Sequence, residues 1–239
     1  MTLKNNLNAF VLGTFIFLAF TSLGYFIGNS AIKFKEYERT VTVKGLSEKE
    51  VQADIVLWPI QFTAAGNNLE DIYALIDRNT KKITEFLIAE GVDNAAISRT
   101  TPSITDRFAQ QYGNQATPEF RYTATQTITV YSHDIESVRR IMGELSILGK
   151  QGIVFSRGDY QSTTEYLFTR LNEIKPEMIE EATRKAREVA EKFASDSKST
   201  LGKIRKATQG QFSIAARDKN NPHIKKIRVV STVEYYLSD

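Results

Sequence analysis

The stretch TVTVKGLSEKEVQADIVLWPIQFTAA, residues 40–65, decides the fold class of this chain. Its first seven residues, 40–46, alternate apolar and polar side chains with the period of two that is typical of a β-strand. We expect a turn at Gly45 and the polar LSEKE that follows it, and then a longer second strand over residues 51–65. Because proline cannot donate to a strand ladder, Pro59 predicts a bulge or a sheet edge at that point.

Downstream of this pair, helical and strand patterns are interleaved. Asn68 is the expected N-cap of a helix whose first turn holds Glu70 and Asp71 and which ends at Gly91. Asp134 is the expected cap of a second helix that ends near Gly149. Further strands are expected over residues 96–108, 120–132, 151–163, 201–216 and 224–237, and a long helix from about Pro176 to Ser197.

The resulting order is ββα, ββα, βα, ββ. It predicts an α+β fold in layers, with helices packed on a largely antiparallel sheet, and it contains no run of βαβ units of the Rossmann kind. In the long helix the apolar residues are spaced three and four apart, which predicts a face packed closely on a sheet, with a coiled coil as the alternative. These residues are Ile179, Ala182, Ala186, Val189 and Phe193.

An apolar segment precedes the folded part. No charged residue occurs between Lys4 and Lys33. A bilayer core needs about 20 apolar helical residues, whereas the apolar core of a signal peptide usually has about 7–15. We therefore expect a short tail at residues 1–6, a transmembrane helix that acts as a signal anchor at 7–32, a juxtamembrane linker at 33–39 and one domain at 40–239. Cleavage at Ser30-Ala31 is the alternative, because small residues precede that bond.

Two features of this segment bear on the membrane. Gly24 and Gly28 form a GxxxG spacing, which lets two helices approach closely in lipid, and they are the candidate residues for packing of transmembrane helices. The flanking charges, Lys4 on one side and Lys33, Lys35 and Arg39 on the other, slightly favour a cytoplasmic carboxyl side. Charge alone therefore does not predict export of the folded domain.

The residues that usually carry catalysis are scarce. The 239 residues include no cysteine and two histidines, His133 and His223, which lack metal-ligand spacing. No GxGxxG, P-loop or GxSxG motif occurs, so we expect no enzyme activity, no cofactor and no metal site. Asp134 is expected to cap a helix rather than to serve His133, and His223 is expected to be solvated. A carboxylate pair of a hydrolase stays possible, because such pairs meet only in the fold.

The charge of the chain is nearly balanced. Its net charge of +3 gives no case for nucleic acid as a partner. A basic set near the carboxyl terminus is expected to cover a solvated face, with anionic lipid headgroups as the alternative partner. This set is Lys203, Arg205, Lys206, Lys225, Lys226 and Arg228.

Four segments together resemble a known family. Residues 39–76 are similar to the opening of the SIMPL domain, also called DUF541, with a glycine-containing strand, an acidic turn, a strand and a helix. Residues 83–104, residues 120–145, and ATRKAREVAEKFA (182–194) followed by LGKI (201–204) resemble its later elements. The chain departs from the family at Ala53-Asp54, where Pro-Asp is frequent, and at Gly152-Ile153, where Gly-Ala is frequent.

The resemblance implies a domain exported to the periplasm of a Gram-negative bacterium, here anchored in the inner membrane by a single pass. Members of the family resemble periplasmic or outer-membrane antigens of the Omp28 type, which form ring-like homo-oligomers, and others are linked to oxidative-stress tolerance. The resemblance implies no catalytic residues. We therefore expect a non-enzymatic homo-oligomer, whose partners are other copies of itself and the lipid bilayer. The alternative is a periplasmic binding module that holds a cell-wall glycan, lipid or hydrophobic ligand in a groove beside the long helix.

Overall fold

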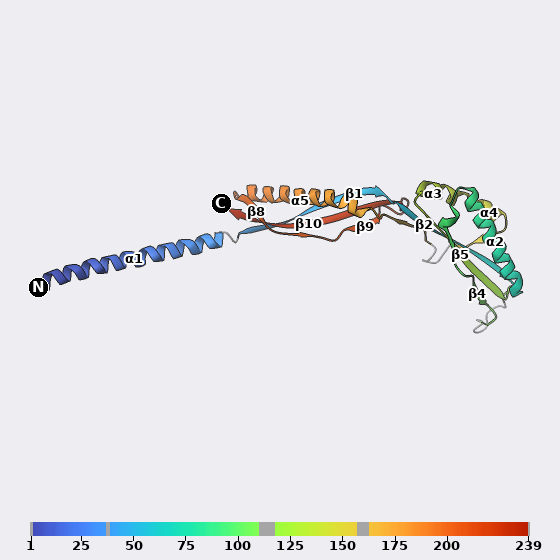
Figure 1. Ribbon diagram of the computed structural model, residues 1–239, viewed down its shortest axis with the longest axis horizontal. Coiled ribbons are helices and arrows are strands. Elements are labelled where there is room, and N and C mark those ends of the chain that lie inside the picture. Colours follow the sequence, from blue (N-terminus) through green and yellow to red (C-terminus); the bar gives the residue numbers. More distant parts are fainter. Residues whose placement is uncertain (1, 37–38, 110–117, 157–162, 239) are drawn as a thin grey trace. The chain divides into compact units, whose positions relative to one another are not determined.

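The structure is a computed structural model that describes residues 2–36, 39–109, 118–156 and 163–238 (Figure 1). The helices are α1 (Thr2–Glu36), α2 (Leu69–Ala89), η1 (Asn94–Ala96, a 3₁₀ turn), α3 (Ile135–Glu144), α4 (Ser146–Lys150) and α5 (Leu171–Asp196). The strands are β1 (Thr40–Gln52), β2 (Ile55–Gly66), β3 (Ile97–Arg99), β4 (Ser103–Asp106), β5 (Tyr122–Ser132), β6 (Val154–Phe155), β7 (Glu165–Leu167), β8 (Thr200–Gln209), β9 (Ser213–Ala216) and β10 (Ile224–Ser238). The fold class is α+β with helices on antiparallel sheets, as the sequence predicts.

The chain divides into two compact units. One consists of residues 1–48, 175–213 and 228–239, and the other of residues 49–174 and 214–227. Helix α1 continues to Glu36 and so includes part of the stretch expected as a linker. The predicted limits of tail, span, linker and domain stay predictions.

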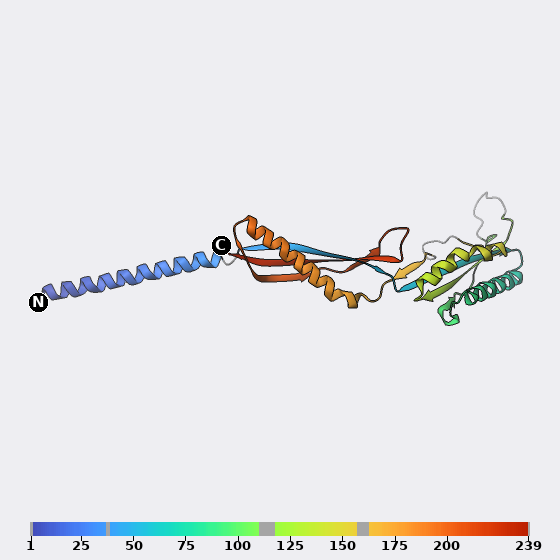
Figure 2. The same ribbon diagram turned by 90° about the horizontal axis from the view of Figure 1, so that it is seen from above.

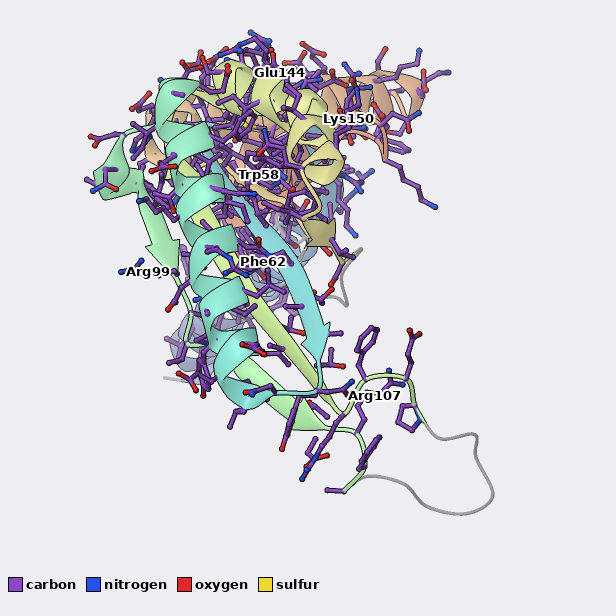
Figure 3. The ribbon with its side chains drawn as sticks, turned by 90° about the vertical axis from the view of Figure 1, so that its right-hand side faces the viewer. Trp58, Phe62, Arg99, Arg107, Glu144 and Lys150 are labelled. Atoms are coloured by element: carbon purple, nitrogen blue, oxygen red, sulfur yellow. The ribbon has the colours of Figure 1, made fainter. Side chains whose placement is uncertain are left out.

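The second unit is a sheet covered on one face by helices α2, α3 and α4 (Figure 3). Its strands follow the order β3-β5-β2-β6, with β4 also on β5 and β7 also on β2. Strands β2 and β5 pair without a register break from Val56–Ser132 to Gly66–Tyr122. Their even-numbered residues face the helices, and Figure 3 shows Trp58 and Phe62 there. Asn68 and Asp134 cap α2 and α3 as predicted, and Gly91 follows α2 with a positive φ of 95°.

Pro59 lies in a central strand without a bulge. Its neighbour Gln61 accepts a hydrogen bond from Ser156 N, so the backbone polar groups of Gln61 face β6. Backbone groups alternate in direction along a strand, so those of Pro59, two residues before Gln61, also face the side of β6. Pro59 has no N–H to donate on that side. There it lies between the pairings of β2 with β7 and with β6, where the described residues record no ladder pair. Within the described residues, Pro59 therefore lies at an interruption of the ladder and not at a bulge, while residues 157–162, which continue from β6, lie outside them.

The first predicted turn is wrong. Strand β1 runs through Gly45 and the polar LSEKE to Gln52, and the turn occurs at Ala53-Asp54. Gly45 is needed for packing instead: a Cβ at this position would fall on the carbonyl oxygen of Ala182 in α5. Glycine therefore lets the backbone of β1 approach the backbone of α5 closely. In the sequence alone, a glycine needed for such packing looks the same as a glycine needed for a turn.

Other predicted elements are divided in the structure. Pro102 separates β3 from β4 within the expected strand 96–108, and the helix after Asp134 breaks at Leu145 into α3 and α4. The expected strand 151–163 contains β6, while residues 157–162 lie outside the described residues. The expected strand 201–216 forms both β8 and β9. Local breaks of this kind follow backbone hydrogen bonds that residue periodicity does not encode.

The first unit contains the helix α5 and a sheet whose outer strands have, among the described residues, a strand partner on one side only. Its strand order is β1-β10-β8, and β10 is antiparallel to β8. Strand β1 is also antiparallel to β10, because Leu237 N donates to Arg39 O and Arg228 pairs with Glu48. The edge strands β1 and β8 therefore run in the same direction.

Helix α5 lies across one face of this sheet (Figure 2). Its buried residues recur every four positions and are Met178, Ala182, Ala186, Ala190 and Ala194. These small side chains bring the helix close to the strands, so the predicted packing on a sheet is confirmed for Ala182 and Ala186. The helix begins at Leu171, earlier than predicted, and contains Pro176.

Candidate functional site

Helix α1 provides one stretch long and apolar enough to cross a membrane, over Phe10–Ser30, among the residues that the structure describes. Its large apolar side chains are exposed, so protein packing does not account for their number. The hydroxyls of Thr14 and Thr21 donate to the carbonyls of Phe10 and Phe17, at 2.9 and 2.7 Å. These bonds satisfy the polar groups within the helix, as a lipid environment requires. By length and composition this helix is suited to act either as a membrane anchor or as a signal sequence.

The two glycines of the GxxxG spacing lie on this helix. A Cβ built on Gly24 or Gly28 meets no atom within 4 Å, so the fold of the described chain does not require glycine at either position. Space of this kind on a lipid-exposed helix is what a second helix needs for close approach. The role in helix packing stays a prediction.

A groove lies between α5 and β8 in the first unit. It has a volume of about 770 Å³ and is lined by Glu180, Thr183, Arg184, Arg187, Gly202, Lys203, Ile204 and Tyr235. We call it the α5–β8 groove. Its charged lining residues sum to a net charge of +2, from three cations and Glu180. Its position beside the long helix matches the place that the binding-module alternative assigned to a ligand.

Ion pairs and burial fix part of the groove wall. Arg187 Nε donates to Glu191 at 2.9 Å, and this hydrogen bond raises the pKa of the Arg187 guanidinium. Burial raises the pKa of the Tyr235 phenol, which is closed off beneath α5. The groove therefore combines an apolar floor with cations that Glu191 and Glu188 partly offset, the latter 4.0 Å from Arg184. This lining suits an occupant with apolar surface and some negative charge.

On its other side α5 carries an exposed apolar face. Val189 is 41% exposed and Phe193 56%, so the prediction that they pack on the sheet is wrong. The buried stripe keeps a spacing of four and uses Ala190 and Ala194 instead. We call the exposed set the α5 ridge; it consists of Glu188, Val189, Lys192, Phe193 and Asp196.

The ridge lies on the β1 side of the helix. Glu181 bonds the buried hydroxyl of Ser47 on β1, and Glu188 and Lys192 follow Glu181 two and three turns later on the same side of α5. The hydrogen bond from Lys185 and then that from Ser47 lower the pKa of Glu181. Ridge and groove therefore lie toward different edges of the sheet, β1 and β8, although Arg184 of the groove pairs with Glu188 of the ridge at 4.0 Å across the outer face of α5. The alanines of α5 recur every four residues in the sequence, and this spacing would have predicted that they form the buried stripe and that Val189 and Phe193 lie outside it.

The two histidines meet in a small cleft of the second unit. His133 and His223 both line a cavity of about 180 Å³ with Asp134 and Glu136. His223 is only 8% exposed and lies edge-to-face with Tyr166, so its predicted solvation is wrong. Burial lowers the pKa of His223, and the charge of Arg139 adds to this effect. Asp134 caps α3 through Ser137 N at 3.0 Å, as predicted.

Asp54 holds the turn beside this cleft. Its carboxylate accepts hydrogen bonds from the N–H and the hydroxyl of Thr169, each at 3.0 Å, and pairs with Arg170 at 3.5 Å. Burial alone would raise the pKa of Asp54, but these hydrogen bonds outweigh it and leave the pKa lowered. Asp54 is therefore ionised and fixes the turn to Thr169 and Arg170. The preceding residue, Ala53, donates its N–H to His223 O.

Within the described residues no group of three or more His, Asp or Glu side chains is placed to hold a metal ion. The basic residues of the predicted carboxyl-terminal set are divided. Arg205 and Arg228 pair with Glu234 and Glu48, whereas Lys203 lines the α5–β8 groove. These basic residues are close together in the sequence, but the sequence does not show that the fold places them at different sites.

The chain was compared with known proteins. A scan against protein-family models matches residues 41–234 to SIMPL, described as a protein of unknown function (DUF541). A search of curated proteins finds no match. The family match begins at the second residue of β1 and ends within β10, so it spans both compact units. This chain belongs to the SIMPL (DUF541) family.

Proposed function

We propose that this protein is a non-enzymatic, membrane-anchored component of the periplasm that assembles with copies of itself into a ring or cage. The observation that carries the proposal is the exposed apolar helix over Phe10–Ser30. A single such span holds every copy in the same orientation on one membrane. The periplasmic side, the inner membrane and a Gram-negative host follow from the family resemblance.

The sheet of the first unit supports assembly. Within the described chain β1 and β8 have a strand partner on one side only, so each leaves a row of backbone N–H and C=O groups unpaired. Unpaired edges of this length are templates for pairing with another chain. Tethering to a membrane raises the effective concentration of the copies, so weak contacts suffice for assembly.

The size of the membrane-extracted protein tests this proposal. Mass photometry of the full chain in mild detergent is expected to give a large homogeneous species. A chain that begins at Lys35 is expected to give the same species only at higher protein concentration, because the tether is lost. A full-length chain that stays monomeric across detergents and concentrations would refute the assembly.

A role in envelope or oxidative-stress tolerance completes the proposal and rests on the family resemblance. Cells that lack the protein are expected to survive peroxide or detergent less well than cells that express it. The matched control is a strain that expresses the chain from Lys35 without an export signal, which separates a role in the envelope from a role in the cytoplasm. Equal survival of all three strains would refute the stress role.

The α5–β8 groove favours one second candidate function, which is a binding module. Its volume of about 770 Å³ and its net positive lining suit an anionic lipid or an acidic cell-wall glycan. Native mass spectrometry of the extracted protein is expected to show retained mass in the wild type and less in an Arg187→Glu variant. Arg78→Glu, on the exposed surface of α2, is the matched control. Absence of retained mass in the wild type counts against the binding module.

A further inference from the structure

The free edges β1 and β8 differ in sequence but run in the same direction. A sheet continued from β8 of one copy into β1 of the next would therefore join them as a parallel pair, with all copies pointing the same way. A self-complementary dimer built on one edge would instead need a two-fold axis and, for antiparallel pairing, opposed copies. Copies held by spans in one membrane share their orientation, which favours the parallel, head-to-tail arrangement.

In this head-to-tail arrangement, one flank of α5 would also meet the opposite flank of α5 in the neighbouring copy. The residues that line the α5–β8 groove sum to +2 and those of the α5 ridge to −1, but Arg184 already pairs with Glu188 at 4.0 Å and Arg187 with Glu191 at 2.9 Å. The apolar side chains of the ridge, and not net charge, therefore carry the complementarity. The groove lies on the β8 side and the ridge on the β1 side of the helix. A head-to-tail neighbour therefore presents its ridge to the groove, with the side chains of Val189 and Phe193 toward the apolar floor.

Elementary dimensions agree with this contact. Three strands per copy at about 4.8 Å place successive α5 helices about 14 Å apart. Packed helices lie about 8–10 Å apart, so an empty strip of about 4–6 Å remains between them. Large side chains are needed to fill such a strip. The ridge supplies Phe193 and Val189, and the groove supplies Arg184 and Arg187.

We infer that a second copy of this chain occupies the α5–β8 groove, with β1 of that copy added to the edge of β8 and its α5 ridge seated in the groove. This inference rests on the proposed function, because it names the contact surface of the proposed assembly. It also assigns the groove to a protein partner instead of a lipid or a glycan.

Disulfide trapping tests the strand contact directly, because the chain has no cysteine of its own. Across the sheet Thr42, Glu234 and Lys206 lie at one level, since Glu234 is paired with Lys206 and the Arg39–Leu237 contact sets the register of β1. Thr42→Cys and Lys206→Cys are both on the sheet face opposite α5 and are exposed. A same-face partner at Thr208→Cys allows for a stagger of two residues between copies.

The full-length double variant Thr42→Cys/Lys206→Cys, oxidised in membranes, is expected to give a ladder of cross-linked species. Each single variant is expected to give none, and a mixture of the two single variants is expected to stop at a dimer. Homodimers from either single variant would show a two-fold contact and overturn the inference. A large species by mass photometry without any β1–β8 cross-link at either register would also overturn it, while the proposed assembly stands. Monomers throughout would overturn both.

The ridge is tested separately through Phe193→Ser. This side chain is exposed in the single chain, so its loss leaves the folded chain intact, as thermal melting would verify. We expect the protein concentration at half-assembly to rise about tenfold or more. Ile88→Ser, an exposed apolar residue of α2 in the second unit, is the matched control and is expected to leave that concentration unchanged. Equal effects of the two substitutions would overturn the assignment of the ridge, and retained anionic lipid in the groove of the assembled protein would overturn the assignment of its occupant.

Discussion

Gln126 joins α2 to β5 through a buried polar network. Its side-chain oxygen accepts a hydrogen bond from the hydroxyl of Thr80 at 2.6 Å, and its amide donates to Thr100 O at 2.7 Å. Gln126 and Thr80 are both buried in an otherwise apolar layer. Satisfied polar groups of this kind fix one arrangement of helix on strand, and their loss leaves orphaned partners.

We expect Gln126→Leu to lower the free energy of unfolding by about 1–3 kcal/mol, because the buried hydroxyl of Thr80 then loses its acceptor and the carbonyl of Thr100 its donor. Chemical denaturation of the full chain in detergent measures this change. The double variant Gln126→Leu/Thr80→Val is expected to recover part of the loss, since it removes one orphaned group. A Gln126→Leu variant as stable as the wild type would show that the network contributes nothing to stability.

Asp54 predicts a dependence of stability on pH. Its pKa is lowered in the fold from the ordinary value of 3.8, so the ionised form stabilises the folded state. This contribution is fully present above the ordinary pKa and is lost as the pH falls through the lowered pKa of the folded state. The melting temperature of Asp54→Asn is therefore expected to lie below that of the wild type near pH 7, and the gap is expected to narrow below about pH 4.

The exposed Asp77 on α2 is the matched control for this pH series. Asp77→Asn is expected to keep the melting profile of the wild type across the range. If the difference in melting temperature between Asp54→Asn and the wild type stays constant from pH 7 to about pH 3, Asp54 acts through packing and not through its charge.

At the scale of elements, the sequence predicted the residues that have local reasons for their positions. Asn68 and Asp134 are caps, Gly91 ends a helix and the alternation in residues 40–46 is a strand, because each depends on neighbours within a few positions. Gly45 was misread because its reason is the distant carbonyl of Ala182. The ridge and the residues that line the groove were missed for the same cause, since they depend on which side of α5 faces which strand.

Gly45 therefore supports a sharp prediction about the contact of β1 with α5. A Cβ there meets backbone atoms of Ala182 and Ala186, which cannot rotate away as a flexible side chain would. Gly45→Ala is expected to destabilise the fold by about 3 kcal/mol, at the upper end of overpacking effects. Gly149→Ala, in α4 with no atom near the added Cβ, is the matched control and is expected to be neutral or slightly stabilising.

Denaturation curves of both glycine variants decide between the two interpretations of Gly45. A turn glycine would tolerate alanine only if its φ were negative, whereas a packing glycine fails for lack of space. A Gly45→Ala variant that unfolds at the same denaturant concentration as Gly149→Ala would show that α5 can move away from β1 at little cost.

At the scale of the whole molecule, the proposed assembly assigns separate contributions to the apolar helix α1 and to the sheet edges β1 and β8. In that proposal the edges define which surfaces meet, and a membrane-spanning α1 would fix the orientation of the copies and raise their effective concentration. If α1 only tethers the chain, any apolar helix of the same length would serve. If α1 also packs on its counterparts, the small residues at Gly24 and Gly28 matter individually, because close approach in lipid depends on them.

Substitution of these two glycines distinguishes tethering from packing. Gly24→Leu/Gly28→Leu keeps the helix apolar and long enough to span, but adds bulk where a neighbouring helix would approach. We expect this variant to stay in the membrane and to assemble only at a higher protein concentration than the wild type, as measured by mass photometry in mild detergent. Gly13→Leu is the matched control, since a Cβ at Gly13 also has open space around it but lies outside the GxxxG spacing. Equal assembly of all three proteins would mean that α1 acts as a tether alone, so that the contacts between copies reside in the folded units.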